Sequence, residues 1–213
     1  PEDWYKTNVV SQVKLHDELR KLNQIEKYIH ISTPEVYGNT KNWIKENFNF
    51  YPSTPYAVSR SACDLHLRSF HEAYNFPVIF TRAANVYGPG QQIYRIIPRT
   101  ILATNGSPKL DLHGGGCSRR SFIHINDVVG ATLKISLNGQ IGETYHISSK
   151  NSISIRELVE KICDAGPDVL AHNLETVKSL QHYIRPQCRY NWSLDTLKTA
   201  SLKKDLIVKS SLM

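Results

Sequence analysis

The sequence lacks long apolar runs and closely spaced cysteines. No apolar stretch in its 213 residues approaches the roughly 20 needed to cross a bilayer, and no basic-then-apolar leader opens it. We therefore expect no membrane association. The cysteines Cys63, Cys117, Cys163 and Cys188 form no Cys-x-x-Cys pair. Their wide spacing argues against a zinc site or a disulfide framework, so we expect no metal and a reducing, cytoplasmic environment.

An initiator methionine is also absent, and basic residues are not clustered. The opening residues, PEDWYKTN, lead us to expect that the sequence begins inside a longer protein. The net charge of +7 is scattered, with short adjacent pairs such as Arg119–Arg120 and Lys203–Lys204. No basic helix, zinc finger or aromatic-rich RNA-binding strand is visible. We expect an acidic small molecule as the ligand rather than nucleic acid.

Helical and strand patterns alternate along the chain. Apolar spacing predicts helices at 2–22, 52–75, 93–104, 127–137 and 154–166, and strands at 27–32, 77–82 and 142–148. Such alternation with apolar strands indicates a parallel sheet covered by helices. Ligands bind at the carboxyl ends of the strands in sheets of this kind. Beyond about residue 166 the pattern weakens, and we expect no element for the tail KKDLIVKSSLM.

The helix that begins near residue 55 has the clearest boundaries. Thr54 is expected to cap it, Pro55 suits its first position, and Asn75 and Pro77 end it. For the later helix we expect the cap at Asn126 or Asp127, and for the last helix an end at Gly166. In YAVSR, Tyr56 and Arg60 lie four residues apart, so both side chains lie on one helix face. A guanidinium beside a phenol favours phenolate and suits acid–base chemistry, although an ordinary surface pair has the same spacing.

These motifs form an ordered series. STPEVYG ends a strand, YAVSR opens a capped helix, RAANVYGPG ends the next strand, and RRSFIHI precedes another helix. In that order they resemble the extended short-chain dehydrogenase/reductases, the NAD-dependent epimerase/dehydratase family that modifies nucleotide sugars. The dTDP-glucose 4,6-dehydratase branch is the most similar. The resemblance runs from about residue 1 to about residue 161 and continues weakly towards residue 195.

The resemblance implies a role for individual residues. Thr33 matches the hydroxyl that hydrogen-bonds the sugar's 4-oxygen, and Glu35 the base that removes the C5 proton. Tyr56 matches the tyrosine that takes the 4-hydroxyl proton as hydride leaves for NAD, and both Tyr56 and Arg60 would contact that cofactor. Sugar–phosphate contacts would come from Asn85, Arg120 and, on a poor match, Arg185. Taken singly, these residues also suit strand ends, turns and surface charges.

Three departures from the family pattern are visible. Pro34 occupies the place of the aspartic acid that protonates the leaving 6-hydroxyl, which weakens the expectation of water loss. Arg60 replaces the lysine of Tyr-x-x-x-Lys, keeping the charge but not the compact ammonium. No Gly-x-x-Gly-x-x-Gly follows a first strand, so the pyrophosphate-binding turn is absent from this sequence.

The sequence therefore predicts an α/β fold, a partial Rossmann-like doubly wound parallel sheet without its first strands. Residues 1–90 would form the C-terminal half of the NAD-binding domain. Residues 91–213 would form mainly a substrate-binding lobe, with 123–148 returning to the sheet. We expect a longer parent enzyme and an inactive isolated chain.

Three functions remain open: a dehydratase, a 4-epimerase or decarboxylase, and a non-catalytic nucleotide-sugar binding fragment. By the same resemblance, the helices at 2–22 and 55–74 could form a homodimer interface.

Overall fold

The computed structural model describes residues 1–22, 24–40, 42–104, 110, 112–165, 169–171, 178, 194, 198 and 207–209. Its helical segments are α1 (Glu2–Tyr5), η1 (Lys6–Val10, a π-helix), α2 (Ser11–Lys21), η2 (Pro34–Tyr37, a 3₁₀-helix), α3 (Pro55–Tyr74), α4 (Ile96–Thr104), η3 (His113–Gly116), α5 (Ile125–Asn138) and α6 (Ile155–Asp164). Its strands are β1 (Tyr28–Ser32), β2 (Val78–Ala83), β3 (Asn85–Tyr87), β4 (Arg119–Arg120), β5 (Phe122–His124), β6 (Thr144–Ile147), β7 (Ile153–Ser154), β8 (Val169–Ala171) and β9 (Ile207–Lys209).

The chain divides into two compact units. The first comprises residues 1–86 and 121–151, and the second residues 87–120 and 152–213. The assignment of a cofactor half to residues 1–90 and a substrate lobe to 91–213 remains a prediction. None of the described helices is long and apolar enough to cross a membrane.

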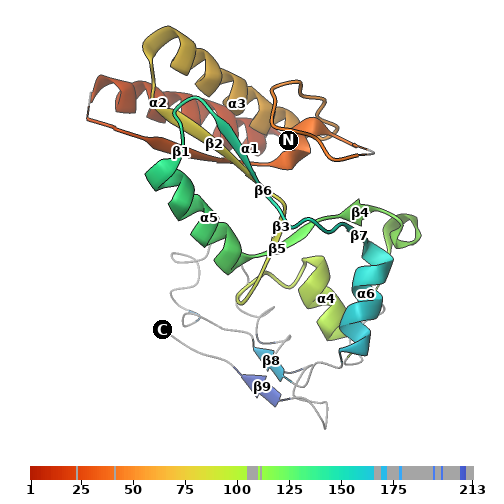
Figure 1. Cartoon of the computed structure of the whole chain (residues 1–213). Coiled ribbons are helices and arrows are strands. Elements are labelled where there is room, and N and C mark those ends of the chain that lie inside the picture. Colours follow the sequence, from red (N-terminus) through yellow and green to blue (C-terminus); the bar gives the residue numbers. More distant parts are fainter. Residues whose placement is uncertain are drawn as a thin grey trace. The chain divides into compact units, whose positions relative to one another are not determined.

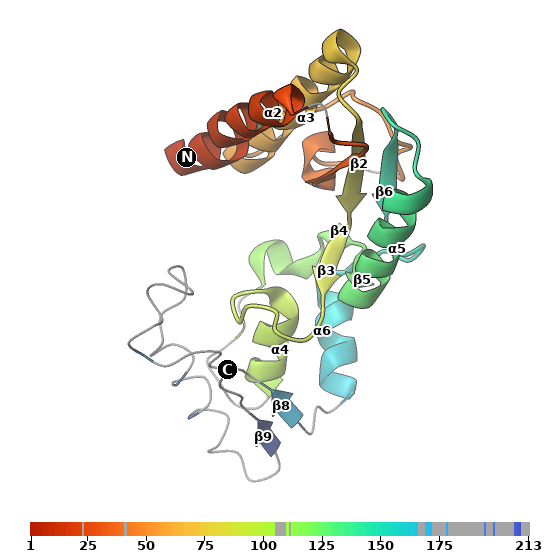
Figure 2. The ribbon, with the colours of Figure 1, turned by 90° about the vertical axis from the view of Figure 1, so that its left-hand side faces the viewer.

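The first unit is built on a parallel sheet in the order β1-β2-β6. In its register, Ser32 of β1 lies opposite Arg82 of β2, and Ala83 lies opposite Ile147 of β6. Helices α2 and α3 lie together on one face, and α5 lies on the other (Figures 1 and 2). This is the predicted parallel α/β sheet, and all strands carry their carboxyl ends to the same edge.

Helix α3 supplies much of the core of this unit. Cys63 and Leu67 are fully buried and cluster with Phe76, Val78 and Phe80. Both predicted ends of the helix are confirmed. The Thr54 hydroxyl accepts a hydrogen bond from the Ala57 N–H at 3.1 Å, and Asn75 ends the helix with φ 55°.

One predicted cap is wrong. Helix α5 begins at Ile125, and its N-cap is His124, whose Nδ1 accepts from the Asn126 N–H at 3.2 Å. Asn126 and Asp127 lie inside the first turn, where the Asp127 carboxylate is favourable to the helix dipole. The predicted helix end at Gly166 lies outside the described residues.

The second unit contains two small sheets and a helix pair. Strand β4 pairs antiparallel with β7, β8 pairs parallel with β9, and α4 contacts α6. Helix α6 begins with a capping box between Ser154 and Glu157, which satisfies two backbone N–H groups at once. Strand β9, at Ile207–Lys209, lies in the tail for which the sequence predicted no element.

Candidate active site

The predicted reactive residues of the first unit gather at the carboxyl edge of the sheet. Thr33 directly follows β1, and Asn85 lies two residues after the last residue of β2. Because β1 and β2 are paired in parallel with Ser32 opposite Arg82, these positions lie at the same edge. Helix α3 also contacts the η2 turn that carries Glu35. Thr33, Glu35, Tyr56 and Arg60 therefore belong to elements that meet at the end of β1.

The local sequence explains the turn after β1. Thr33 is extended (φ −141°) and its hydroxyl accepts from the Glu35 N–H at 3.3 Å, which makes Thr33 the N-cap of η2. Pro34 occupies the first helical position, where its missing N–H costs nothing and its fixed φ suits the helix. Gly38 then turns the chain with φ +68°, and an added Cβ would lie 2.0 Å from the Tyr51 carbonyl oxygen.

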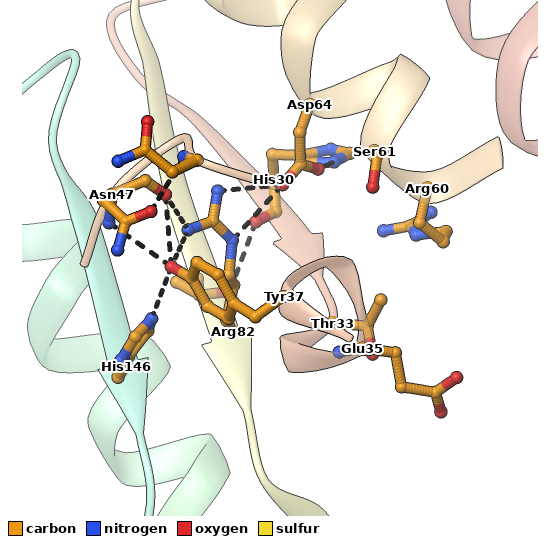
Figure 3. Close-up of polar contacts among 12 residues, drawn as sticks. His30, Thr33, Glu35, Tyr37, Asn47, Arg60, Ser61, Asp64, Arg82 and His146 are labelled. Atoms are coloured by element: carbon orange, nitrogen blue, oxygen red, sulfur yellow. Dashed lines mark hydrogen bonds and ion pairs between the residues drawn. The ribbon is translucent and has the colours of Figure 1, made fainter. Parts of the chain in front are cut away.

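The two polar side chains of this turn, Thr33 and Glu35, differ in their exposure to solvent. Thr33 is buried, whereas Glu35 is exposed. Figure 3 shows the Glu35 carboxylate pointing outward, away from the buried side chains of the neighbouring elements. A solvated carboxylate on a rigid turn can accept a proton from a bound ligand, and the short 3₁₀-helix limits how far it can move.

Tyr56 and Arg60 occupy the first turns of α3. The half-buried Tyr56 ring packs edge-on against Trp4, with ring centroids 5.1 Å apart. Arg60 reaches the sheet instead, and its Nη2 donates to the Ile31 carbonyl oxygen. This bond ties α3 to the end of β1, two residues before Thr33. Helical spacing brings the two side chains to one face, and the tertiary contact directs the guanidinium to the strand end.

The remaining predicted residues are more dispersed. Asn85 is exposed, and its Nδ2 donates to the Ser121 carbonyl oxygen at 3.3 Å. Arg120 belongs to the second unit, where it is exposed and donates to the Arg119 carbonyl oxygen at 3.0 Å. Arg185 lies outside the described residues. The described part of the first unit thus carries the predicted proton-transfer groups, whereas Arg120 lies in the other unit.

Next to this site lies a buried polar network that the sequence did not predict. The Arg82 side chain is completely buried, and its Nη2 and Nε donate to Asp64 Oδ2 at 3.0 and 3.3 Å. The other Asp64 oxygen lies 3.0 Å from His30 Nε2. On its opposite side Arg82 bonds the Tyr37 hydroxyl and, at 2.9 Å, the Asn47 carbonyl oxygen (Figure 3).

The electrostatics of this network favour charge on Asp64. Burial by itself would raise the pKa of Asp64, but hydrogen bonding from His30 and the nearby charges hold that pKa below its ordinary value. The ionised carboxylate can only accept, so His30 Nε2 carries the proton of their hydrogen bond. A fully buried guanidinium is tolerated here because a carboxylate and oxygen acceptors surround it.

One sequence signal could have revealed the network. Arg82 stands in a largely apolar strand that the pattern predicts to be buried, and a buried cation requires an acceptor. Asp64 lies on the predicted companion helix, but no local spacing connects residues 18 positions apart. Tyr37, the last residue of η2, also belongs to the network. Its exposure of 7% agrees with packing, and its hydroxyl has the additional bonds described above.

Comparison with known proteins now defines the class. A sequence model of the NAD dependent epimerase/dehydratase family matches residues 1–148, and the chain belongs to that family. It is 37% identical over 139 residues to the dTDP-D-glucose 4,6-dehydratase of Mus musculus. That alignment covers 65% of this chain but 39% of the relative.

Solved structures show the same fold. The dTDP-glucose 4,6-dehydratase of Bacillus anthracis, in complex with NAD, superposes with a TM-score of 0.70 at 32% identity, over 75% of this chain and 52% of that one. The UDP-N-acetylglucosamine 4-epimerase of Methanobrevibacter ruminantium M1 gives a TM-score of 0.68 at 30% identity, over 75% and 52% of the two chains. The chain thus spans about two fifths of the mouse relative and about half of each solved one.

Proposed function

We propose that the protein containing this chain is an NAD-dependent enzyme that modifies a nucleotide-diphosphate sugar by dTDP-glucose 4,6-dehydratase-like chemistry. The observation that carries the proposal is the meeting of the Thr33–Glu35 turn and the Tyr56–Arg60 helix at the end of β1. Similarity of more than 30% to dTDP-glucose 4,6-dehydratases over most of the chain supports it.

Each residue has a role that its position allows. Tyr56 would accept the 4-hydroxyl proton during oxidation at C4, and the buried Thr33 hydroxyl would hold the 4-oxygen. Glu35, exposed on its turn, would remove the C5 proton once the C4 ketone has acidified it. Asn85 would contact the sugar–phosphate, and Arg120 and Arg185 would bind phosphate oxygens.

The described residues suit one part of NAD. Bound NAD would supply the acceptor for the hydride that leaves C4 of the sugar, and it would later give that hydride back. Arg60 Nε is buried and has no hydrogen-bond partner within the described ranges, so a donor one helical turn after Tyr56 remains for a ribose hydroxyl. The glycine-rich pyrophosphate turn is absent from the sequence. The residues present thus fit the nicotinamide-ribose end, and the pyrophosphate would be held by other parts of the protein.

Pro34 favours a second candidate function, a 4-epimerase. Epimerisation needs oxidation and re-reduction at C4, but it needs no acid for a leaving 6-hydroxyl. Pro34 is exposed and has no titratable group, so this position cannot supply that acid. The same residue leaves decarboxylation open.

The test uses the protein at its full natural length with NAD and dTDP-glucose. A 4-keto-6-deoxy product identifies the dehydratase, and a 4-epimer identifies the second candidate. Tyr56→Phe should lower kcat by about 100-fold or more, the usual range for loss of an acid–base group, with nucleotide-sugar affinity retained. Tyr51→Phe is the matched control, because that side chain is 83% exposed.

Two outcomes would reject the proposed chemistry. Binding of dTDP-glucose without any turnover by the wild-type protein indicates a non-catalytic binding protein. Turnover that Tyr56→Phe leaves unchanged removes Tyr56 from the mechanism.

We also propose a homodimer formed through α1, α2 and α3. These helices, together with the η1 segment between α1 and α2, carry exposed apolar side chains, of which Trp4 is 48%, Val10 49% and Leu65 47% exposed. Large apolar side chains gathered on neighbouring helices are typical of an interface. A cytoplasmic location also belongs to this proposal, and it rests on the cysteine spacing.

A further inference from the structure

Arg82 connects elements that are far apart in the sequence. It stands on β2, its guanidinium bonds Asp64 of α3, and it reaches Tyr37 at the end of η2. The same group donates to the Asn47 carbonyl oxygen at 2.9 Å, in the loop after the turn. The α3 helix bears Tyr56, and η2 bears Glu35. One buried side chain therefore joins the two elements that carry the proposed proton-transfer groups (Figure 3).

The surroundings of Arg82 leave it little freedom. Aromatic rings enclose the guanidinium, whose carbon lies 5.1 Å from the Tyr37 centroid, 5.1 Å from Phe48 and 4.9 Å from Phe50. Rings at such distances attract the cation and exclude water from its hydrogen bonds. The Arg82–Asp64 pair therefore forms a rigid buried anchor.

The Tyr37 hydroxyl connects the Arg82–Asp64 pair to the η2 turn. It accepts from Arg82 Nη1 and, at 3.3 Å, from the Asn47 N–H. Its own proton is directed to His146 Nε2 at 2.9 Å or to the Asn47 carbonyl oxygen at 3.2 Å. Burial lowers the pKa of His146, against the opposing effect of Glu46, so the ring is neutral at neutral pH and can accept.

We propose that Tyr37 is a positioning residue whose hydroxyl, held by Arg82, His146 and Asn47, fixes the Thr33–Glu35 turn relative to helix α3. Tyr37 is the last residue of η2 and lies two positions after Glu35. Its catalytic consequence rests on the proposed function: a turn free to shift would carry Glu35 away from the proton it removes, and a displacement of 1 Å costs up to about 100-fold in rate.

The experiment compares Tyr37→Phe with the control Tyr145→Phe, in the full-length protein. Both remove one hydroxyl. The Tyr145 hydroxyl accepts from the Gln140 N–H at 2.9 Å, away from the network. Amide hydrogen exchange is measured by NMR at Gly38 and Tyr51, whose N–H groups donate to the Glu35 and Val36 carbonyl oxygens at 3.0 and 2.9 Å. We expect Tyr37→Phe to accelerate exchange at both amides by about 10-fold, the effect of losing one hydrogen bond.

Kinetics with dTDP-glucose and NAD form the second arm. Tyr37→Phe should lower kcat by about 10- to 100-fold while KM stays within about twofold, because positioning acts in the transition state. Tyr145→Phe should change neither exchange at the turn nor kcat. Arg82→Lys keeps a cation near Asp64 but loses the planar fork, and it should also accelerate exchange at Gly38.

The two arms separate the inference from the proposed function. A wild-type protein without turnover rejects the proposed function, and the exchange arm still decides whether Tyr37 holds the turn. Exchange at Gly38 and Tyr51 that is unchanged in Tyr37→Phe overturns the positioning role. Accelerated exchange with unchanged kcat, in an active enzyme, overturns its catalytic consequence.

Discussion

At the level of single residues, a histidine occupies the interior of the first unit. His16 of α2 is completely buried, with Nε2 3.1 Å from the Tyr28 hydroxyl and its ring stacked on His66 at 5.5 Å. Burial, then the neighbouring His30 and His66, lower the pKa of His16 to about 4. A neutral imidazole is favoured because a charged one would lose its hydration.

This residue predicts a pH-dependent stability. The folded-state pKa of His16 lies below the ordinary 6.5, so the unfolded chain binds more protons between these values. Its contribution is complete above pH 6.5 and is lost as the pH falls towards 4, up to roughly 3 kcal/mol at 1.4 kcal/mol per pH unit. Urea unfolding at pH 7.5 and 4.5 should show a smaller acid loss in His16→Leu than in wild type.

Lys14→Gln is the control for that experiment. Lys14 is exposed on the same helix and makes no contribution to the buried histidine cluster, so the variant should keep the wild-type acid loss. Equal losses in His16→Leu and wild type would show that His16 does not set the acid sensitivity.

At the level of secondary-structure elements, the local sequence predicted the ends of α3 more reliably than the direction in which its apolar face points. Thr54, Pro55 and Asn75 define α3 through short-range rules, and the structure has them as predicted. The spacing of Val58, Ala62, Leu65 and Ser69 also marks one face. That face is the outward one, since Val58 is 38% and Leu65 47% exposed. Periodicity finds a stripe, but it does not say what covers the stripe.

The Thr54 cap should contribute measurably to the stability of α3. Thr54→Ala removes the acceptor for the Ala57 N–H and should lower the free energy of unfolding by about 1 kcal/mol, the usual cost of losing such a cap. Thr54→Ser keeps a hydroxyl and should retain most of that stability. Urea unfolding of the two variants measures the difference. Equal losses in Thr54→Ala and Thr54→Ser would mean that the methyl group, not the hydrogen bond, stabilises the helix start.

At the scale of the whole molecule, the first unit keeps two sets of exposed apolar side chains. One lies on α1, α2 and α3 and includes Trp4 and Leu65. The other lies on α5 and includes Val129, Leu133 and Leu137, which are 59%, 60% and 68% exposed. Single exposed apolar residues are normal on a protein surface, whereas each of these two sets contains several. The homodimer proposal concerns the first set.

The dimer prediction compares these two surfaces. Leu65→Glu places a charge in the proposed interface and should weaken dimerisation by about 100-fold, because burying an unpaired carboxylate among apolar side chains is costly. Leu137→Glu makes the same change on α5 and should leave the dimer intact. Sedimentation equilibrium of the full-length protein measures both masses. A monomeric wild type, or dissociation by Leu137→Glu alone, contradicts the interface on α1, α2 and α3.

The sequence identified some residues of the candidate site but not others. Thr33, Glu35, Tyr56 and Arg60 were selected from ordered motifs, and the structure places their elements together at the end of β1. Asp64, His30 and His146 were not selected, because a contact between distant residues leaves no local spacing. Pro34 was identified as a departure from the family pattern. The structure adds a local reason for its fit, the first position of a 3₁₀-helix.

The sequence alone was sufficient to predict the alternation of helices and strands, the parallel sheet and the ends of α3, and its family resemblance indicated the candidate proton-transfer groups. Each depends on short-range periodicity, capping or an ordered motif. The packed structure was needed to show that Arg82, Asp64 and Tyr37 form one buried network and that the apolar stripe of α3 faces outward. The physical reason is that a buried charge and a covered face are defined by the chain segments packed around them, and those segments are distant in sequence.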